Sequence, residues 1–317
     1  LLSVYKLKDM KIVVFGVGGV GGFFGGKLAK AGFDVTFIAR GENLKAIKEK
    51  GLQIKSIQGD FKVHPKATDN IHEISNTNLV ILAVKSWQID AIAKQLKSVI
   101  SHDTMILPLQ NGADNADRLR AILPKKNGLA GLCKIVSKIE SPGVINHFEF
   151  EPEIIFGEYD NSKTERIQKL KSVFDKAGFK NVHSDNIHLD IWKKFLFIAT
   201  VSGIGAITRS VFGVMREDKN IRDLLYQTAN EIKAVANAKG IPLENKHIEM
   251  AIAIVDRMEY NTTASMQRDF MEGKPSELQN FNGYIVEQGK LLNIPTPVNK
   301  FTYHCLLPQE LRARKQL

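Results

Sequence analysis

The sequence predicts an α/β fold, in which a doubly wound parallel sheet is followed by a mostly α-helical C-terminal domain. Three observations lead to this prediction. Short apolar runs alternate with amphipathic helical segments over about the first 150 residues. A glycine-rich loop joins the first of these runs to the first helix. From about Asp185 onward, helical patterns replace the strand-like runs.

The strands expected in the first part are short and almost entirely apolar, as is typical of strands covered by helices on both faces. They are predicted over Lys11–Phe15, Val35–Ala39, Leu79–Val84 and Met105–Leu109. Helices are expected between them, including Gly22–Ala31 and Asn43–Lys50. Between about Lys134 and Glu158 the pattern is strand-like again, with a turn at Ser141-Pro142-Gly143. Antiparallel strands in this region are expected to close the sheet.

The second part is predicted to consist of helices over Ile187–Val214, Ile221–Ala238, Lys246–Glu259 and Ser276–Leu292. Gly240-Ile241-Pro242 and Asn293-Ile294-Pro295 mark two helix ends, because Gly or Asn followed by Pro stops a helix. A domain boundary is therefore placed near Asp185. It divides the chain into residues 10–185 and 186–317.

The composition excludes several classes of protein. Hydrophobic residues make up 44% of the 317 residues and charged residues 25%, which is ordinary for a globular protein and not for a disordered chain or a coiled coil. The two cysteines, Cys133 and Cys305, lack CxxC spacing, so neither a disulfide framework nor a usual zinc site is expected. No other metal site is indicated, and a reducing, cytoplasmic location is predicted.

Neither a membrane span nor a signal peptide is expected. The longest apolar run, Phe195–Ile207, is shorter than the roughly 20 residues that a span requires, so it is predicted to be a core helix. Leu1–Met10 carries lysines but no continuous apolar stretch, which favours an extension ahead of Met10.

The glycine-rich loop has the pattern GxGxxG, formed by Gly16-Val17-Gly18-Gly19-Val20-Gly21. It follows an apolar strand and opens a helix, which is the context in which this pattern binds a dinucleotide. Glycines let the backbone approach a pyrophosphate, and the helix N-terminus supplies free N–H donors. The alternative is a purely conformational turn. Residues 10–185 are therefore predicted to form a Rossmann-type domain. Gly25 and Gly26 lie within the helix, and close helix–strand or helix–ligand approach would explain them.

Arg40 ends the second strand, where an NAD-binding fold usually carries Asp or Glu. A guanidinium can instead bind a 2′-phosphate through a charge-assisted fork, which favours NADPH. The alternatives are a solvated surface arginine and a competing acidic role for Glu42.

Candidate catalytic residues lie at strand ends and helix starts. Lys85 and Asn111 follow predicted strands, although each could be a solvated lysine or a simple turn. Lys193 and Lys194 precede the apolar run, and helical periodicity does not distinguish them. Glu277 stands at a helix start, where it could also be a capping residue. Hydrolase motifs such as GxSxG and HExxH are absent.

Taken in order, several motifs resemble the 2-dehydropantoate 2-reductase (ketopantoate reductase) family over nearly the whole chain from Met10. They are MKIVVFGVGGVGGFFG, Arg40, AVKSWQ around Lys85, LPLQNGADN around Asn111, SPGVINH at 141–147, IWKKF at 191–195, SMQRD at 265–269, KPSELQNFNG at 274–283 and IPTPVN at 294–299. The resemblance implies reduction of a 2-oxo acid by NADPH, with pantoate as product, for pantothenate and coenzyme A synthesis.

The resemblance also implies roles for individual residues. Lys194 matches the general acid, and Glu277 matches a carboxylate of the cofactor-side network that keeps the lysine charged and oriented. Asn111 matches a residue between cofactor and substrate, and Lys85 one near the nicotinamide. Ser265 matches a residue that binds the substrate carboxylate.

The sequence departs from the family where Ile198 and Ser202 replace two asparagines that line the substrate pocket in the best-studied members. Another short 2-oxo acid is therefore an alternative substrate, and an NADPH-binding sensor without turnover is an alternative function. The formal net charge of +10 raises nucleic-acid binding as a further alternative, but no recognition motif supports it. The expected partner is a small molecule and not a nucleic acid or a membrane. The oligomeric state stays open, with a homodimer among the alternatives.

Overall fold

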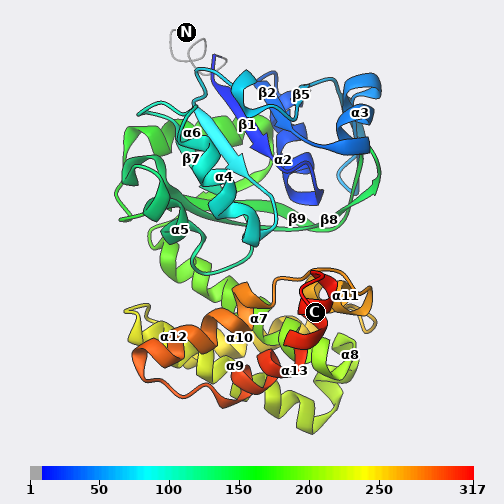
Figure 1. The fold of residues 1–317 in the computed structure, drawn as a ribbon, viewed down its shortest axis with the longest axis vertical. Helices are drawn as coiled ribbons and strands as arrows, with labels where there is room; N and C mark the ends of the chain where they lie inside the picture. Colours follow the sequence, from blue (N-terminus) through cyan, green and yellow to red (C-terminus); the bar gives the residue numbers. More distant parts are fainter. Residues whose placement is uncertain (1–8) are drawn as a thin grey trace. The chain divides into compact units, whose positions relative to one another are not determined.

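The computed structural model describes residues 9–317, so the N-terminal extension expected over Leu1–Met10 lies almost wholly outside the described residues. The chain forms two compact units (Figure 1). The first contains the described residues up to Gln110 together with Asp114–Ile187. The second contains Asn111–Ala113 and His188–Leu317. Each unit has its own hydrophobic core.

The first unit is built on a parallel sheet in the order β5–β2–β1–β6–β7. Its strands are β1 (Lys11–Phe15), β2 (Asp34–Ile38), β5 (Lys66–Thr68), β6 (Leu79–Leu82) and β7 (Met105–Pro108). Counted within this sheet the order is 3-2-1-4-5, that of the dinucleotide-binding fold. The predicted parallel sheet is confirmed. The edge strand β5 was not predicted.

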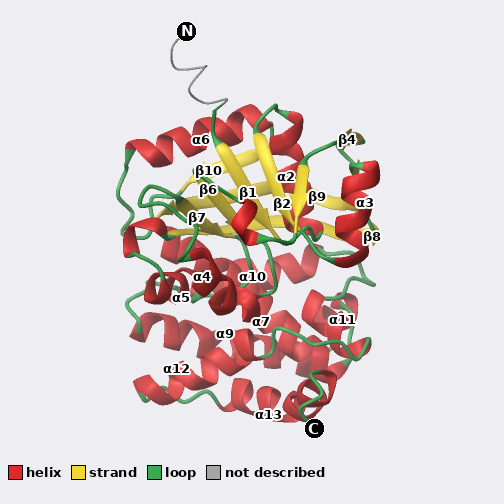
Figure 2. Ribbon diagram, turned by 45° about the horizontal axis from the view of Figure 1, so that its top comes forward, coloured by secondary structure: helices red, strands yellow, loops and turns green. Residues whose placement is uncertain are grey.

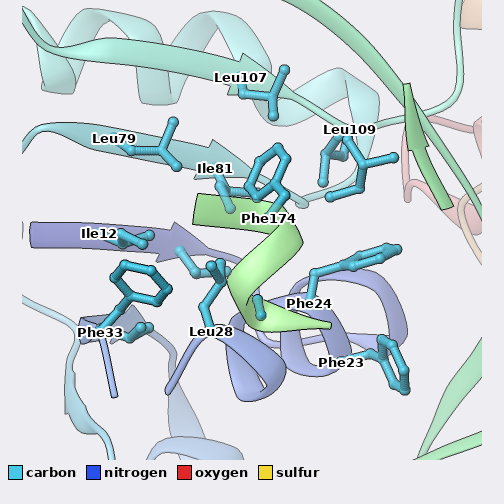
Figure 3. Close-up of a cluster of buried hydrophobic side chains, with 14 of the residues drawn as sticks. Ile12, Phe23, Phe24, Leu28, Phe33, Leu79, Ile81, Leu107, Leu109 and Phe174 are labelled. Carbon is cyan, nitrogen blue, oxygen red and sulfur yellow. The ribbon is translucent and has the colours of Figure 1, made fainter. Parts of the chain in front are cut away.

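Helices cover both faces of this sheet because alternate side chains of each strand point to opposite faces. Ile12 and Val14 of β1 join one core cluster with α2 (Gly19–Lys30) and α6 (Glu165–Ala177). Figure 3 shows Leu28 of α2 and Phe174 of α6 among the residues of this cluster. Val13 and Phe15 join a second cluster with α4 (Ile89–Leu96) and α5 (Asn115–Ile122). The apolar strands are therefore buried from both sides.

A second sheet lies on the far side of α2, in the order β10–β9–β3–β4 with β8 paired to β9. Its strands are β3 (Leu52–Ser56), β4 (Phe61–Val63), β8 (Leu129–Ser141), β9 (Val144–Glu158) and β10 (Lys180–His183). The hairpin of β8 and β9 is antiparallel, as predicted. The prediction that it closes the parallel sheet is wrong, because β9 pairs with β3 and β10 instead.

Glycines let α2 fit between the two sheets. A Cβ on Gly25 would lie 2.6 Å from the Phe37 ring of the parallel sheet. A Cβ on Gly26 would lie 3.2 Å from Ile54 of the second sheet. The close helix–strand approach that was expected to explain these glycines is confirmed. The remaining elements of this unit are α3 (Gly41–Lys50) and the short 3₁₀ turns η1 (Ile71–Glu73), η2 (Ser86–Gln88) and η3 (Lys125–Asn127).

The second unit is helical (Figure 2). Its elements are α7 (Ile187–Thr208), α8 (Phe212–Glu217), α9 (Lys219–Ala238), α10 (Asn245–Arg257), α11 (Ser265–Met271), the π-helical turn η4 (Gln279–Gly283), α12 (Tyr284–Leu292) and α13 (Pro297–Ala313). The predicted helix stops are confirmed: Gly240 and Asn293 both have positive φ just beyond α9 and α12. The helix predicted over Ser276–Leu292 begins only at Tyr284, because the π-helical turn η4 precedes it. The helix α13 was not predicted.

The apolar helix α7 forms the centre of this unit. By length and composition it could cross a membrane, but 67% of its most apolar window is buried within the protein. Trp192, Phe195 and Ile204 pack with residues of α9, α10 and α12. The predicted core helix is therefore confirmed.

Candidate active site

The glycine-rich loop occupies the turn between β1 and α2. Gly16 has a φ of +89°, a left-handed conformation that favours glycine. The N-cap residue Gly18 has no side chain to cap the helix, and the first turn of α2 carries no acidic residue. Because Gly22 N–H donates to Gly18 O at 2.8 Å, the preceding N–H groups have no partner within the helix. This turn therefore fits an anionic pyrophosphate.

Asn43 fixes this loop, and sequence reasoning did not identify it. Its Nδ2 donates to Val17 O at 3.0 Å, and its Oδ1 accepts from Gly143 N–H at 2.8 Å. One side chain of α3 thereby joins the glycine-rich loop to the turn between β8 and β9. Both partners are distant in sequence, so no local pattern could have indicated this role.

Arg40 is exposed at the carboxyl end of β2, where it is the N-cap residue of α3. Glu42 is exposed in the first turn of the same helix. A guanidinium in this position is accessible to a phosphate group at the sheet edge. Glu42 remains close in sequence as a competing charge.

Lys85 follows β6 and caps η2. Its side chain is exposed, with Nζ 5.6 Å from the centroid of the Trp87 ring. The adjacent Ser86 is buried, and its carbonyl accepts from Arg118 Nη1 at 3.0 Å. Lys85 therefore stands on a fixed backbone at the carboxyl edge of the parallel sheet.

Lys194 and Asn111 are brought together in the second unit. Lys194 Nζ donates to Asn111 Oδ1 at 2.6 Å, although the residues are 83 positions apart in sequence. Lys193 Nζ instead donates to Asp190 Oδ1, at 3.2 Å within the same helix. The structure thus separates two lysines that helical periodicity could not, and it places Lys194 beside the predicted site residue.

Asn111 belongs to a constrained loop between β7 and α5. Asn115 Nδ2 donates to Gln110 O at 2.9 Å, which closes the loop around Asn111. Gln110 is buried, and neither polar atom of its side chain has a hydrogen-bond partner. Burial raises the pKa of Asp114 from 3.8 to about 6, against the opposing effect of Arg118.

Glu277 is a buried carboxylate, 6% exposed, in the segment that leads into η4. Aromatic contacts tie this segment to the turn of α7 that carries Lys194. The Phe195 ring centroid lies 6.1 Å from those of Phe281 and Tyr284, and Trp192 lies 6.2 Å from Tyr284. Through these contacts, the turn of α7 that carries Lys194 packs against the segment that follows Glu277.

Ser265 is exposed as the first residue of α11. The helix is held by Gln267, whose Nε2 donates to Ser210 O at 2.9 Å. Gln267 also packs closely on Gly205 of α7, where an added Cβ would lie only 2.6 Å from its Oε1. These contacts lie near the C-terminal end of α7, about three turns from Lys194. They do not themselves bring Ser265 to the lysine.

Ile198 and Ser202 continue the line of Lys194 along α7 at intervals of four residues, which lie on the same helix face. Ile198 is half-buried, as Lys194 is, whereas Ser202 is buried. The surface one turn beyond the lysine is therefore apolar. Over residues 9–317, no group of three or more His, Cys, Asp and Glu side chains is arranged to hold a metal ion.

Comparison with known proteins accounts for both units. Residues 12–161 match the family model of the ketopantoate reductase PanE/ApbA, and residues 186–310 match the model of its C-terminal part. The chain belongs to the ketopantoate reductase family. Its Rossmann-like first part and helical second part are those of the family, and it is an oxidoreductase. The resemblance seen in the sequence is confirmed.

Several relatives cover nearly the full length of this family member. The uncharacterized oxidoreductase YkpB of Bacillus subtilis is 32% identical over 93% of the chain and 97% of its own length. The 2-dehydropantoate 2-reductase of Pyrococcus abyssi is 31% identical over 97% of the chain and all of its own length. The crystal structure of a ketopantoate reductase from Ralstonia eutropha superposes with a TM-score of 0.89, at 28% identity, over 96% of the chain and all of that structure.

The same fold occurs in a D-mandelate dehydrogenase solved with NADH and anilino(oxo)acetate, with a TM-score of 0.88 at 24% identity over 96% of the chain and 99% of that structure. At this identity the likeness concerns the fold alone.

Proposed function

We propose that this protein reduces 2-dehydropantoate to pantoate with NADPH. The observation that supports this most directly is the 2.6 Å hydrogen bond from Lys194 Nζ to Asn111 Oδ1, which joins two residues that the family motif assigns to the reaction. The relative from Pyrococcus abyssi bears the name of this activity. The substrate is accordingly a small molecule.

Lys194 acts as the proton donor in this proposal. The reduced nicotinamide, when bound, supplies the hydride. The Lys194 ammonium stabilises the negative charge that develops on the substrate carbonyl oxygen and then protonates that oxygen. Asn111 Oδ1 accepts from this ammonium at 2.6 Å, which fixes where Lys194 Nζ lies.

Glu277 keeps Lys194 charged and oriented. A carboxylate that is 6% exposed has lost most of its hydration, so it requires a cation or several donors nearby. Lys194 is carried by the turn of α7 that packs against the segment following Glu277. A carboxylate beside an ammonium favours the protonated form of the lysine, which is the form that can donate.

The first unit would hold the cofactor. The N–H groups of Gly18 to Gly21 would bind the pyrophosphate, and Arg40 would bind the 2′-phosphate. Lys85 would stand near the nicotinamide end, at the carboxyl edge of the sheet.

A second candidate substrate is a 2-oxo acid with an apolar side chain. Ile198 favours it, because this half-buried residue presents an apolar surface one turn from Lys194. Burying a polar group of the substrate against such a surface without a hydrogen bond costs about 1–3 kcal/mol.

The decisive experiment measures NADPH oxidation by the purified protein with 2-dehydropantoate and with a panel of 2-oxo acids that have apolar side chains, and repeats the series with NADH. Turnover confined to 2-dehydropantoate supports the first proposal, and turnover confined to the apolar oxo acids supports the second. Binding of NADPH without oxidation of it by any substrate would contradict both and would favour a sensor.

A further inference from the structure

Ser276, the residue directly before Glu277, is held by the C-terminal helix α13. Glu310 of that helix is buried, and both of its carboxylate oxygens accept from Ser276 N–H, at 3.1 and 3.0 Å. Glu310 Oε2 also accepts from Ser276 Oγ at 2.5 Å. One side chain of α13 thus binds two donors of a residue 34 positions earlier.

Arg314, one turn after Glu310, completes this arrangement. Its Nε donates to Glu310 Oε1 at 2.5 Å, and its Nη2 donates to Ser276 O at 2.9 Å. The guanidinium therefore balances the charge of Glu310 and binds the remaining backbone polar group of Ser276. The N–H, the hydroxyl and the carbonyl of Ser276 are all fixed by two residues of the C-terminal segment.

The chain after Glu277 is fixed as well. Ser276 Oγ accepts from Leu278 N–H at 3.2 Å, and Glu277 O accepts from Phe281 N–H at 3.0 Å. The π-helical turn η4 follows, and π-helical turns are rare features found frequently at functional sites. The Glu277 backbone therefore has little freedom, and its carboxylate leaves a defined point of the chain.

Stability alone does not explain an ion pair at this position in which Glu310 is buried and Arg314 is mostly buried. Replacing a buried pair by apolar residues is often neutral or stabilising, because both charges must be desolvated. The hydrogen bonds of the pair are directional, so the pair determines the position of the Ser276 backbone. We infer that Glu310, held by Arg314, is a positioning residue that aims the Glu277 carboxylate for the reaction. This inference rests on the proposed function, in which Glu277 orients Lys194.

The test is a double-mutant cycle with Glu310→Gln and Glu277→Gln, read as kcat for NADPH oxidation and as the Kd of NADPH. Glu310→Gln keeps the shape of the side chain and removes its charge. We expect kcat to fall about tenfold to a hundredfold, the loss that a misplacement of about 1 Å can cause. In the Glu277→Gln background the same change should have almost no further effect on kcat.

The matched control is Asp256→Asn, which removes the bidentate partner of Arg222 elsewhere in the second unit. It should leave kcat at the wild-type value. Arg314→Lys keeps the positive charge but loses the planar guanidinium that binds both Glu310 and Ser276. It should therefore lower kcat, as Glu310→Gln does. It also provides a second test if Glu310→Gln does not fold.

The outcomes separate the inference from the proposed function. Wild-type kcat in Glu277→Gln would overturn the role of Glu277 and the inference with it. A slow Glu277→Gln enzyme together with unchanged kcat in both Glu310→Gln and Arg314→Lys would overturn the inference alone. Equal losses of kcat from Glu310→Gln in both backgrounds would show that Glu310 acts independently of Glu277, as a purely structural tether.

Discussion

Lys194 donates to Asn111, whereas its neighbour Lys193 donates to Asp190 within α7, so adjacent lysines offer a matched pair of variants. Lys194→Met keeps an unbranched side chain but removes the proton donor, and kcat should fall by about 10²–10⁴-fold. Lys193→Met should lower kcat by less than about twofold, because its side chain faces Asp190.

Steady-state kinetics with 2-dehydropantoate and fluorescence titration with NADPH check this prediction together. The Kd of NADPH should stay near the wild-type value in both variants, since the phosphates of the cofactor are proposed to bind the glycine-rich loop and Arg40 and not either lysine. If Lys193→Met were the slower variant, the assignment of the proton donor to Lys194 would be wrong.

Arg40 should determine the choice between NADPH and NADH. Loss of one charge-assisted bond costs about 1.5–3 kcal/mol, so Arg40→Gln should raise the Kd of NADPH about tenfold to a hundredfold. The Kd of NADH, which has no 2′-phosphate, should hardly change. Glu42→Gln serves as the opposite control and should lower the Kd of NADPH, because it removes a negative charge close in sequence to Arg40. Equal effects of Arg40→Gln on both cofactors would exclude a 2′-phosphate contact.

At the scale of elements, the start of α5 carries an unfavourable charge. Burial raises the pKa of its N-cap residue Asp114 from 3.8 to about 6, and its Oδ1 is buried without a hydrogen-bond partner. A carboxyl whose pKa is raised in the folded state binds its proton more tightly there than in the unfolded chain. This tighter proton binding adds to the free energy of unfolding. The contribution is complete below pH 4 and is lost as the pH rises through 6.

Asp114→Asn should therefore stabilise the protein at pH 8, by about 1–3 kcal/mol in the free energy of unfolding. Asn is also a good N-cap residue, so the helix start is preserved. The gain should vanish near pH 4, which urea denaturation at pH 4, 6 and 8 would measure. A gain from Asp114→Asn that is the same at pH 4 and pH 8 would rule out the buried charge as its cause.

The sequence predicted those elements whose pattern reflects burial on both faces. β1 has the predicted bounds, and the other three predicted strands of the parallel sheet begin within one residue of the expected position. The pairing of β9 with β3 and β10 could not be predicted, because β3 lies about 90 residues earlier in the sequence and α6 separates β9 from β10. α12 was expected to begin at Ser276 but begins at Tyr284, because the π-helical turn Gln279–Gly283 precedes it and has no separate sequence pattern.

The same distinction applies to the candidate site. The glycine-rich loop, Lys194 and Glu277 lie in short motifs, and their positions could be predicted from those motifs. Asn43 binds Val17 and Glu310 binds Ser276, and both partners are far away in the sequence. The neighbouring sequence of Asn43 and Glu310 does not distinguish them from surface polar residues. Sequence reasoning therefore finds the residues of a motif and misses the residues that hold a motif in place.

At the scale of the whole molecule, the chain enters the second unit twice. Asn111–Ala113 belongs to that unit, after which the chain returns to the first unit until Ile187. This excursion is what places Asn111 beside Lys194. A single boundary near Asp185 divides the chain into two continuous parts, so it cannot represent the excursion.

The formal net charge of +10 is also a property of the whole molecule, and it bears on how anions bind. NADPH carries more negative charge than NADH, and exposed charges are screened within about 10 Å at 0.1 M salt. The Kd of NADPH should therefore rise several-fold between about 50 and 300 mM NaCl, and that of NADH should rise less. At saturating cofactor and substrate, kcat should stay nearly constant, because the chemical step takes place within the bound complex.

Fluorescence titration of both cofactors across this salt range measures the two slopes, and a duplex DNA competitor provides the comparison. Nucleic-acid affinity that depends only on net charge weakens steeply with salt, so DNA should not displace NADPH at about 150 mM NaCl. Displacement there would mean that the basic surface serves a nucleic acid. Equal salt slopes for NADPH and NADH would instead show that the excess positive charge does not act on the 2′-phosphate.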